Sequence, residues 1–199
     1  AELGINLTKE ASDRFSYEFD LAGYYMIIDN WIAWQPAGGI WRPYNLKEVS
    51  ATGLEIGGSL AFLQPWGKIH LNGQIAYNQS VLRQGIDEND LAVGYQLPYT
   101  PKYRGTLSGS ILFKNYRLGI MSYYVGERTG QDVVNEMVEA YFLTNLNLGR
   151  QIPLGKHALS AEVQVLNVFD ISYQNVKHYA MPGRNFLLSI RYLFNNHKH

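Results

Sequence analysis

The sequence is marked first by what it lacks. It contains no cysteine, which excludes a disulfide framework, thiolate chemistry and any metal site built on cysteine. It has no uninterrupted apolar run near the length of about 18 residues that a membrane-spanning helix needs; runs such as Tyr24 to Ile28 are far shorter. The formal net charge is +0, so the composition gives no sign of a nucleic-acid partner. Helical membrane spanning and nucleic-acid binding are therefore not predicted.

What the sequence has instead is a strict alternation of apolar and polar side chains. The segment Arg184 to Phe194 sets large apolar residues against smaller or polar ones, and the same period recurs over Phe15–Ile27, Leu54–Phe62 and Ile69–Tyr77. Successive side chains of a strand point to opposite faces, so each segment has one apolar face. A soluble sandwich would cover that face with a second sheet. Its recurrence along the whole chain predicts that lipid covers it.

The alternation also predicts which side chains face lipid and which face the interior. The residues expected on the outer, convex face are Leu159, Val163, Phe186, Leu188, Ile190 and Tyr192. Those expected on the inner face are Glu18, Glu55, Glu162, Gln164 and Arg191. The reason is the cost of placing a charged side chain on the lipid face.

Short and long connections alternate between the predicted strands. The short ones are Glu10–Arg14, Gln64–Gly67, Lys114–Asn115 and Ile152–Lys156. The long ones are Gln35–Tyr44, Leu82–Tyr103, Gly126–Glu139 and Asp170–Arg184. This pattern is typical of bacterial outer-membrane barrels, with short periplasmic turns and longer extracellular loops. The prediction is an all-β fold, an antiparallel meander of about nine strands that forms part of a transmembrane β-barrel.

Three sequence motifs carry a resemblance to a known family. They are Leu97-Pro98-Tyr99-Thr100-Pro101-Lys102, then Asn167-Val168-Phe169-Asp170 with Tyr173, then Pro182-Gly183-Arg184-Asn185-Phe186 ahead of a strand ending in Phe194. In order and spacing the chain resembles the C-terminal part of a TonB-dependent outer-membrane receptor. Such receptors are 22-stranded barrels with a plugged lumen. The resemblance implies that residues 1–194 supply about the last nine strands and that residues 195–199 form a polar tail.

The resemblance also implies a location and partners. The expected location is the outer membrane of a Gram-negative bacterium. The expected partners are the lipid bilayer, an N-terminal plug, the remaining barrel strands and a small-molecule nutrient. The TonB complex is expected to bind through the N-terminal part of the receptor, which this sequence does not include. No enzyme is expected, because the sequence contains no nucleophile elbow and its carboxylates are spread over different strands. An outer-membrane lipase or protease is the rival, and it would need a Ser or Asp triad near the outer rim.

A second, narrower resemblance concerns one connection and its flanking strands. Trp31-Ile32-Ala33-Trp34-Gln35-Pro36 and Gly39-Ile40-Trp41-Arg42-Pro43-Tyr44-Asn45, followed by Gly53-Leu54-Glu55, resemble the receptors for cobalamin uptake. The implied ligand-binding residues are Trp34, Trp41, Arg42 and Tyr44. Tryptophans that only brace the loop or anchor it at the membrane interface are the alternative. A siderophore receptor for iron chelates and a small self-standing structural or adhesive barrel also remain open.

One further segment carries candidate metal ligands. Asp87, Glu88 and Asp90 offer hard oxygen atoms at close spacing, which suits a calcium ion in an extracellular loop. The segment lacks the regular spacing of an EF-hand, so a solvated acidic loop is the competing interpretation. No other cofactor is expected, and no histidine pair has the spacing of a zinc site.

Overall fold

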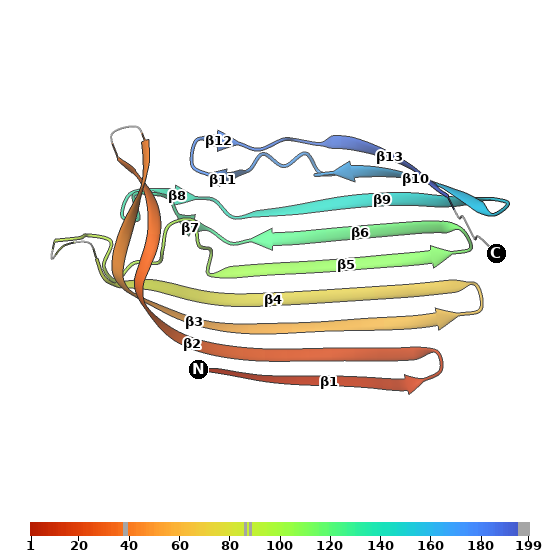
Figure 1. Ribbon diagram of the computed structural model, residues 1–199, viewed down its shortest axis with the longest axis horizontal. Helices are drawn as coiled ribbons and strands as arrows, with labels where there is room; N and C mark the ends of the chain where they lie inside the picture. Colours follow the sequence, from red (N-terminus) through yellow and green to blue (C-terminus); the bar gives the residue numbers. More distant parts are fainter. Residues whose placement is uncertain (38–39, 86, 88, 195–199) are drawn as a thin grey trace.

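A single antiparallel sheet dominates the structure, a computed structural model that describes residues 1–37, 40–85, 87 and 89–194. Its nine strands are hydrogen-bonded in the order β1-β2-β3-β4-β5-β6-β9-β10-β13 (Figure 1). Their bounds are β1 Glu2–Ser12, β2 Phe15–Ala37, β3 Ile40–Gln64, β4 Gly67–Gln84, β5 Tyr103–Phe113, β6 Tyr116–Val125, β9 Tyr141–Leu154, β10 His157–Leu166 and β13 Asn185–Leu193. The predicted all-β meander is confirmed. The described residues contain no helix that is both long and apolar enough to cross a membrane.

The tight turns and the loops separate to opposite ends of the sheet, as predicted (Figure 1). The turns join β1 to β2, β3 to β4, β5 to β6 and β9 to β10. At the other end, two small sheets order the loops: β7 (Arg128–Thr129) pairs with β8 (Met137–Val138), and β11 (Gln174–Val176) pairs with β12 (Tyr179–Ala180). The loops after β6 and β10 are therefore structured segments of this end of the sheet, the mouth.

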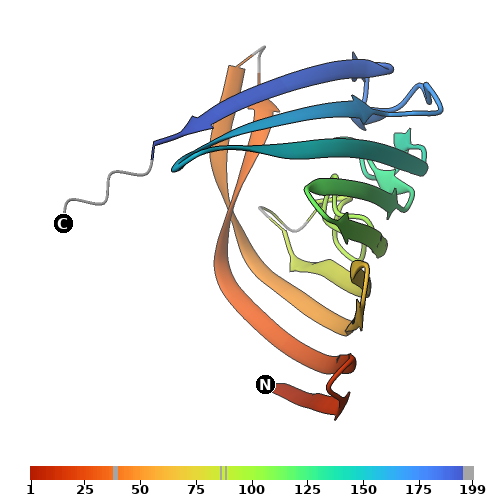
Figure 2. The same ribbon diagram turned by 90° about the vertical axis from the view of Figure 1, so that its right-hand side faces the viewer.

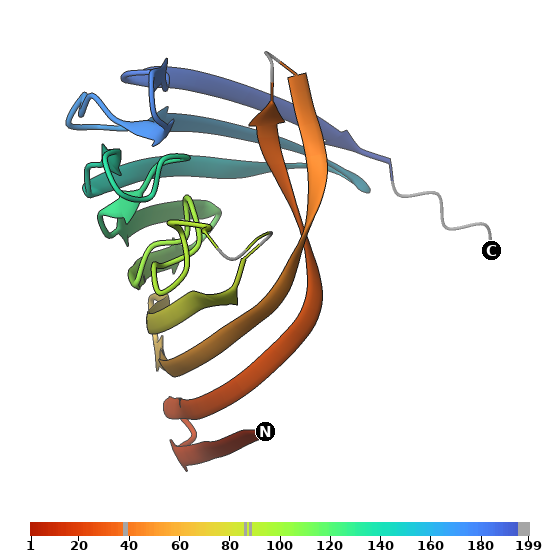
Figure 3. The same cartoon turned by 90° about the vertical axis from the view of Figure 1, so that its left-hand side faces the viewer.

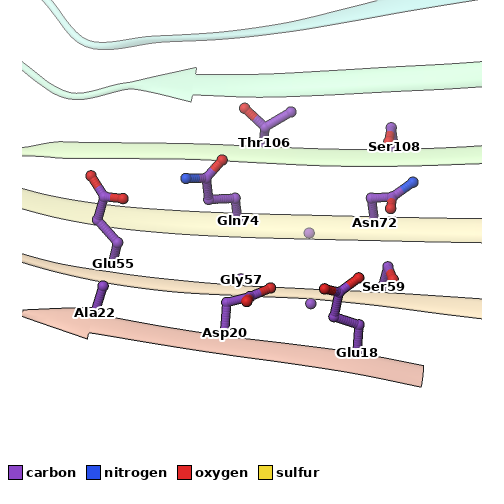
Figure 4. Close-up of a pocket in the computed structure, with 12 residues that line it drawn as sticks. Glu18, Asp20, Ala22, Glu55, Gly57, Ser59, Asn72, Gln74, Thr106 and Ser108 are labelled. Atoms are coloured by element: carbon purple, nitrogen blue, oxygen red, sulfur yellow. The ribbon is translucent and has the colours of Figure 1, made fainter. Parts of the chain in front are cut away.

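The sheet bends into an arc whose two outer strands lie at its open edges (Figures 2 and 3). Polar side chains from β2 to β5 project together from one side of the sheet (Figure 4). At the other edge of the sheet, the strand register shows which residues share a face. Val163 is paired with Leu148 and Leu188, whereas Glu162 is paired with Gly149 and Ser189. Directly opposed residues share a face and neighbours in a strand do not. The predicted division between apolar and polar faces is confirmed.

The apolar face has no protein partner among the described residues. Phe186 is 72% exposed, Ile190 67% and Leu188 64%, which is the arrangement expected of a surface solvated by hydrocarbon. Two hydroxyls on this face, those of Ser122 and Thr144, lie 3.0 Å apart and satisfy each other. Pairing of this kind removes the cost of a lone polar group in lipid.

Buried apolar packing is concentrated at the loop end. Leu46, Val49 and Leu82 form a small cluster. Against it packs the loop that follows β4, which folds back along that strand: Gly94 N–H donates to the Leu82 carbonyl at 2.8 Å, and Leu97 N–H donates to the Ser80 carbonyl at 2.8 Å. The returning loop thus pairs with the part of β4 that extends beyond β5.

The prediction of a loop over Gln35–Tyr44 is wrong. β2 continues to Ala37, β3 begins at Ile40, and the two remain paired with Trp34 opposite Pro43. Together they form a two-stranded hairpin that stands across the loop end of the sheet (Figure 1). Pro36 and Pro43 both lie within the paired segments, and a two-stranded hairpin has outer edges on which a missing N–H costs no ladder bond.

Two neighbouring residues of β6 test the division of faces. Ile120 is 47% exposed and lies opposite Gly109 and Leu146, whereas Met121 is 46% exposed and lies opposite Ser108 and Asn145. We expect Ile120→Arg to lower the free energy of unfolding from a lipid bilayer by about 2–4 kcal/mol, because it places a cation in hydrocarbon. Met121→Arg, the matched control on the polar face, should change it by less than about 0.5 kcal/mol. Equal losses for the two variants would contradict the assignment.

Candidate functional site

The concave wall of the sheet carries a polar surface with an acidic part on β2 and β3. Glu18 and Asp20 of β2 and Glu55 of β3 all line a hollow of about 470 Å³ (Figure 4). The Asn6 side-chain amide donates to both β2 carboxylates, at 3.1 Å to Glu18 Oε1 and 2.5 Å to Asp20 Oδ1. Such a wall can hold water and bind cationic groups.

A second hollow on the same face has a different charge. It lies near the tight turns, has a volume of about 470 Å³, and is lined by Arg117 and Arg191 as well as Glu162. The Gln164 amide donates to Glu162 Oε1 at 2.5 Å. The wall is thus acidic on β2 and β3 and carries two arginines on β6 and β13. Neither hollow places a serine, histidine and carboxylate in a catalytic arrangement.

The hairpin carries the predicted ligand-binding residues and distributes them over both of its faces. Tyr44 lies opposite Ala33, and Arg42 lies opposite Gln35. Trp34 lies opposite Pro43, one position out of phase with both pairs, and is 61% exposed. Since neighbouring positions of a strand point to opposite faces, Trp34 and Tyr44 do not share one.

The face that carries Tyr44 is the one that meets the rest of the mouth. Its partner Ala33 packs against the buried cluster around Leu46. Trp41 lies opposite Pro36 in the register; its side chain lies outside the described residues.

The acidic loop after β4 uses its described carboxylates to shape the chain. Asn89 N–H donates to Asp87 Oδ1 at 2.9 Å, and Ala92 N–H donates to Asp90 Oδ1 at 3.0 Å. Bonds of this kind are typical of Asx turns. Glu88 lies outside the described residues, and within the described part of the chain no three acidic or histidine side chains gather as a metal would require.

Two of the three family motifs, those around Asn167 and Arg184, contact one another in the structure. The Asn167 amide donates to the Ile171 carbonyl and accepts from the Ile171 N–H, each at 2.9 Å. Three residues further on, Asp170 accepts the Arg184 backbone N–H at 2.6 Å. Asn167 and Asp170 both adopt positive φ, 51° and 55°, a conformation that Asn and Asp tolerate better than most residues. These motifs therefore set the path of the last loop.

Arg128 is the site residue that the sequence did not reveal. It is only 5% exposed. Its Nη2 donates to the carbonyls of Gln174 and Asn175 at 2.9 and 3.1 Å, and its guanidinium lies 5.5 Å from the centre of the Tyr141 ring. Burial lowers the pKa of the guanidinium, and the neighbouring Tyr141 opposes that shift.

A backbone hydrogen bond connects the loop that carries Arg128 to the loop after β4. Tyr99 N–H donates to the Thr129 carbonyl at 2.8 Å. Together with Arg128, this bond ties the loops after β4, β6 and β10 into one assembly at the mouth. No spacing in the sequence signals a lone arginine that acts between distant loops.

Comparison with known proteins decides the family. Residues 1–168 match the family described as TonB dependent receptor-like, beta-barrel. The chain belongs to this family. Its members lie in the outer membrane of Gram-negative bacteria and are transporters, so the receptor barrel is not an enzyme.

Two curated relatives are distant. The chain is 23% identical over 194 residues to the vitamin B12 transporter BtuB of Vibrio vulnificus, covering 89% of this chain and 27% of the relative. It is 22% identical over 182 residues to the vitamin B12 transporter BtuB of Photobacterium profundum, covering 89% and 28%. The chain thus spans about a quarter of the length of the curated relatives it matches.

Solved structures of similar fold include two receptors. One is the ferric-catecholate import receptor Fiu of E. coli K12, which is 21% identical, has a TM-score of 0.65, and is matched over 96% of this chain and 27% of its own. The other is the siderophore receptor PiuA of Acinetobacter baumannii, which is 18% identical, has a TM-score of 0.66, and is matched over 96% of this chain and 28% of its own. At this identity the likeness establishes the barrel fold alone.

Replacement of Arg128 tests the brace at the mouth. We expect Arg128→Met to lower the free energy of local opening by about 1–3 kcal/mol, because it leaves the carbonyls of Gln174 and Asn175 without their donor. Hydrogen exchange of the amides in Gln174–His178 should then be faster, with the exchange of β10 unchanged. Arg104→Met, which removes an exposed arginine nearby, is the control and should leave both rates as they are. Unchanged exchange in Arg128→Met would contradict the role of the brace.

Proposed function

We propose that residues 1–194 form the C-terminal barrel wall of a receptor that binds a bulky, scarce nutrient outside the cell and imports it with energy from the TonB complex. Cobalamin is the nutrient we favour. The observation that carries this proposal is the hairpin of β2 and β3, which brings aromatic and cationic residues to the mouth above a polar wall. The names of the two curated relatives, both vitamin B12 transporters, support the same choice.

The remaining barrel strands and a plug are the proposed protein partners. Within the described sheet, β1 and β13 each pair on one side only and do not pair with each other. In hydrocarbon an unpaired strand edge leaves backbone groups that no lipid can satisfy. This supports a wall completed by further strands over a small self-standing barrel. The polar concave face suits a plug that hydrogen-bonds to it.

The hairpin suits a large ligand with polar edges. Aromatic side chains provide contact area at little conformational cost, and Arg42 adds a cation that can stack or donate hydrogen bonds. Arg42 and Tyr44 occupy the hairpin face that meets the mouth. We therefore place the ligand on that face, and keep Trp34, which lies on the opposite face, and Trp41 as further proposed contacts. An iron chelate is the alternative ligand, because the solved receptors Fiu and PiuA are named for such chelates.

Side-chain truncations on the two hairpin faces test the nutrient and the binding face together. In the native polypeptide that contains this sheet, we expect Arg42→Ala with Tyr44→Ala to weaken cobalamin binding to whole cells about tenfold, equal to about 1.4 kcal/mol. Trp34→Ala should weaken it less, because Trp34 lies on the opposite face. Ile32→Ala shares the Trp34 face and is 65% exposed, so it serves as the control for a general change in the hairpin.

Assembly of each variant is measured separately, by its amount in the outer membrane. Cobalamin binding that is unchanged in the double variant, together with uptake of an iron chelate, would show that the cobalamin assignment is wrong and leave the receptor assignment standing. A greater loss in Trp34→Ala would place the ligand on the opposite face of the hairpin.

A further inference from the structure

A gap interrupts the apolar side chains on the lipid-facing side of the sheet. Gly58 of β3 and Gly73 of β4 lie directly opposite each other. Alternation places them on the face that carries Ile56 and Ile75, which are also directly opposed. One row of the apolar surface therefore has no side chains where two neighbouring strands meet.

The gap is part of a groove of about 550 Å³ on that face. Its walls are large apolar and aromatic side chains, and a third glycine, Gly105 of β5, widens it. The wall residues are Ile56, Ile75, Leu107, Tyr124 and Phe142. Leu107 and Ile75 are both 64% exposed, so the groove opens outward.

The floor of the groove and the Ser122 hydroxyl on its wall have their hydrogen bonds satisfied by the protein. Its floor is backbone of β3, β4 and β5 held in ladder hydrogen bonds. The Ser122 hydroxyl on its wall pairs with the Thr144 hydroxyl at 3.0 Å. An apolar chain can therefore cover the floor of the groove and Ser122 without stranding a donor or acceptor there.

The position of the groove along the strands indicates which membrane leaflet it faces. Gly105 lies close to Tyr103, where β5 begins at the loop end, and long loops of such barrels are extracellular. One row nearer the loops, Tyr77 and Tyr103 lie directly opposite each other with ring centres 5.3 Å apart. Tyrosines in this position mark the headgroup level. The groove thus lies on the hydrocarbon side of the outer interface.

We propose that this groove is a binding site for one acyl chain of an outer-leaflet lipid, which in the Gram-negative outer membrane is lipopolysaccharide. The groove continues the lipid-facing surface that the receptor barrel presents to the membrane, so a membrane lipid is the occupant that reaches it directly. The glycines replace a flat contact by a recess, in which a chain gains contact on several sides. The site does not depend on which nutrient the receptor imports.

Two glycine substitutions separate this site from the rest of the apolar face. A Cβ at Gly73 would lie 3.7 Å from Leu107 Cδ1, and a Cβ at Gly23 would lie 3.8 Å from Leu54 Cδ1, so both positions accept a Cβ without a clash. Gly23 is opposite Leu54, hence on the same face, and lies outside the groove. Gly73→Leu fills the recess, and Gly23→Leu is its matched control.

The measurement is the lipid retained by the native polypeptide extracted from outer membranes in mild detergent, counted by native mass spectrometry. We expect wild type and Gly23→Leu to retain lipopolysaccharide and Gly73→Leu to retain about tenfold less. Equal retention by all three, or retention of phospholipid in place of lipopolysaccharide, would overturn the proposal.

A photo-crosslinking residue keeps the test valid if Gly73→Leu does not assemble. Placed at Leu107, on the groove wall, it should form an adduct with lipopolysaccharide in otherwise wild-type protein. Placed at Leu118, which lies on the same face nearer the tight turns and is 50% exposed, it should not. Absence of the adduct at Leu107, or equal adducts at both positions, would refute the site.

Discussion

The structure depends on the need of every backbone N–H and C=O to find a partner where no water is present. In hydrocarbon a strand can satisfy these groups only through neighbouring strands, which makes the uninterrupted meander from β1 to β13 the simplest arrangement. The same need reaches beyond the sheet. Where β4 extends past β5, the following loop returns and pairs with it through Leu82, Gly94 and Leu97.

Stability is distributed differently at the two ends of the wall. In the middle of the sheet the side chains face lipid on one side and the interior on the other, so little is buried by the protein itself. At the loop end the protein must supply its own packing, and it does so with the cluster around Leu46 and with Arg128 between the loops. A mouth braced in this way holds its loops in defined positions, which favours binding because less conformational entropy is lost when a ligand arrives.

The lipid face combines uniform chemistry with local relief. Its side chains are almost all apolar, yet the opposed glycines Gly58 and Gly73 create a recess between rows of isoleucine and leucine. A surface of this kind solvates easily in any bilayer and still offers a particular lipid more contact at one place. The recess forms because glycine has no side chain to fill the space between the rows.

The sequence by itself determined the sheet, its topology and its two faces, because period-two alternation and alternating connection lengths are local properties that each strand carries alone. It placed Glu162 and Val163 on opposite faces, and a short connection at Lys114–Asn115, as the structure has them. Only the tertiary structure decided how the mouth is built. The two halves of the hairpin stay paired from Trp31 to Ala37, which puts Trp34 and Tyr44 on opposite faces. Arg128 and the groove at Gly73 depend on strands and loops far apart in the chain meeting side by side, and no local pattern records such a meeting.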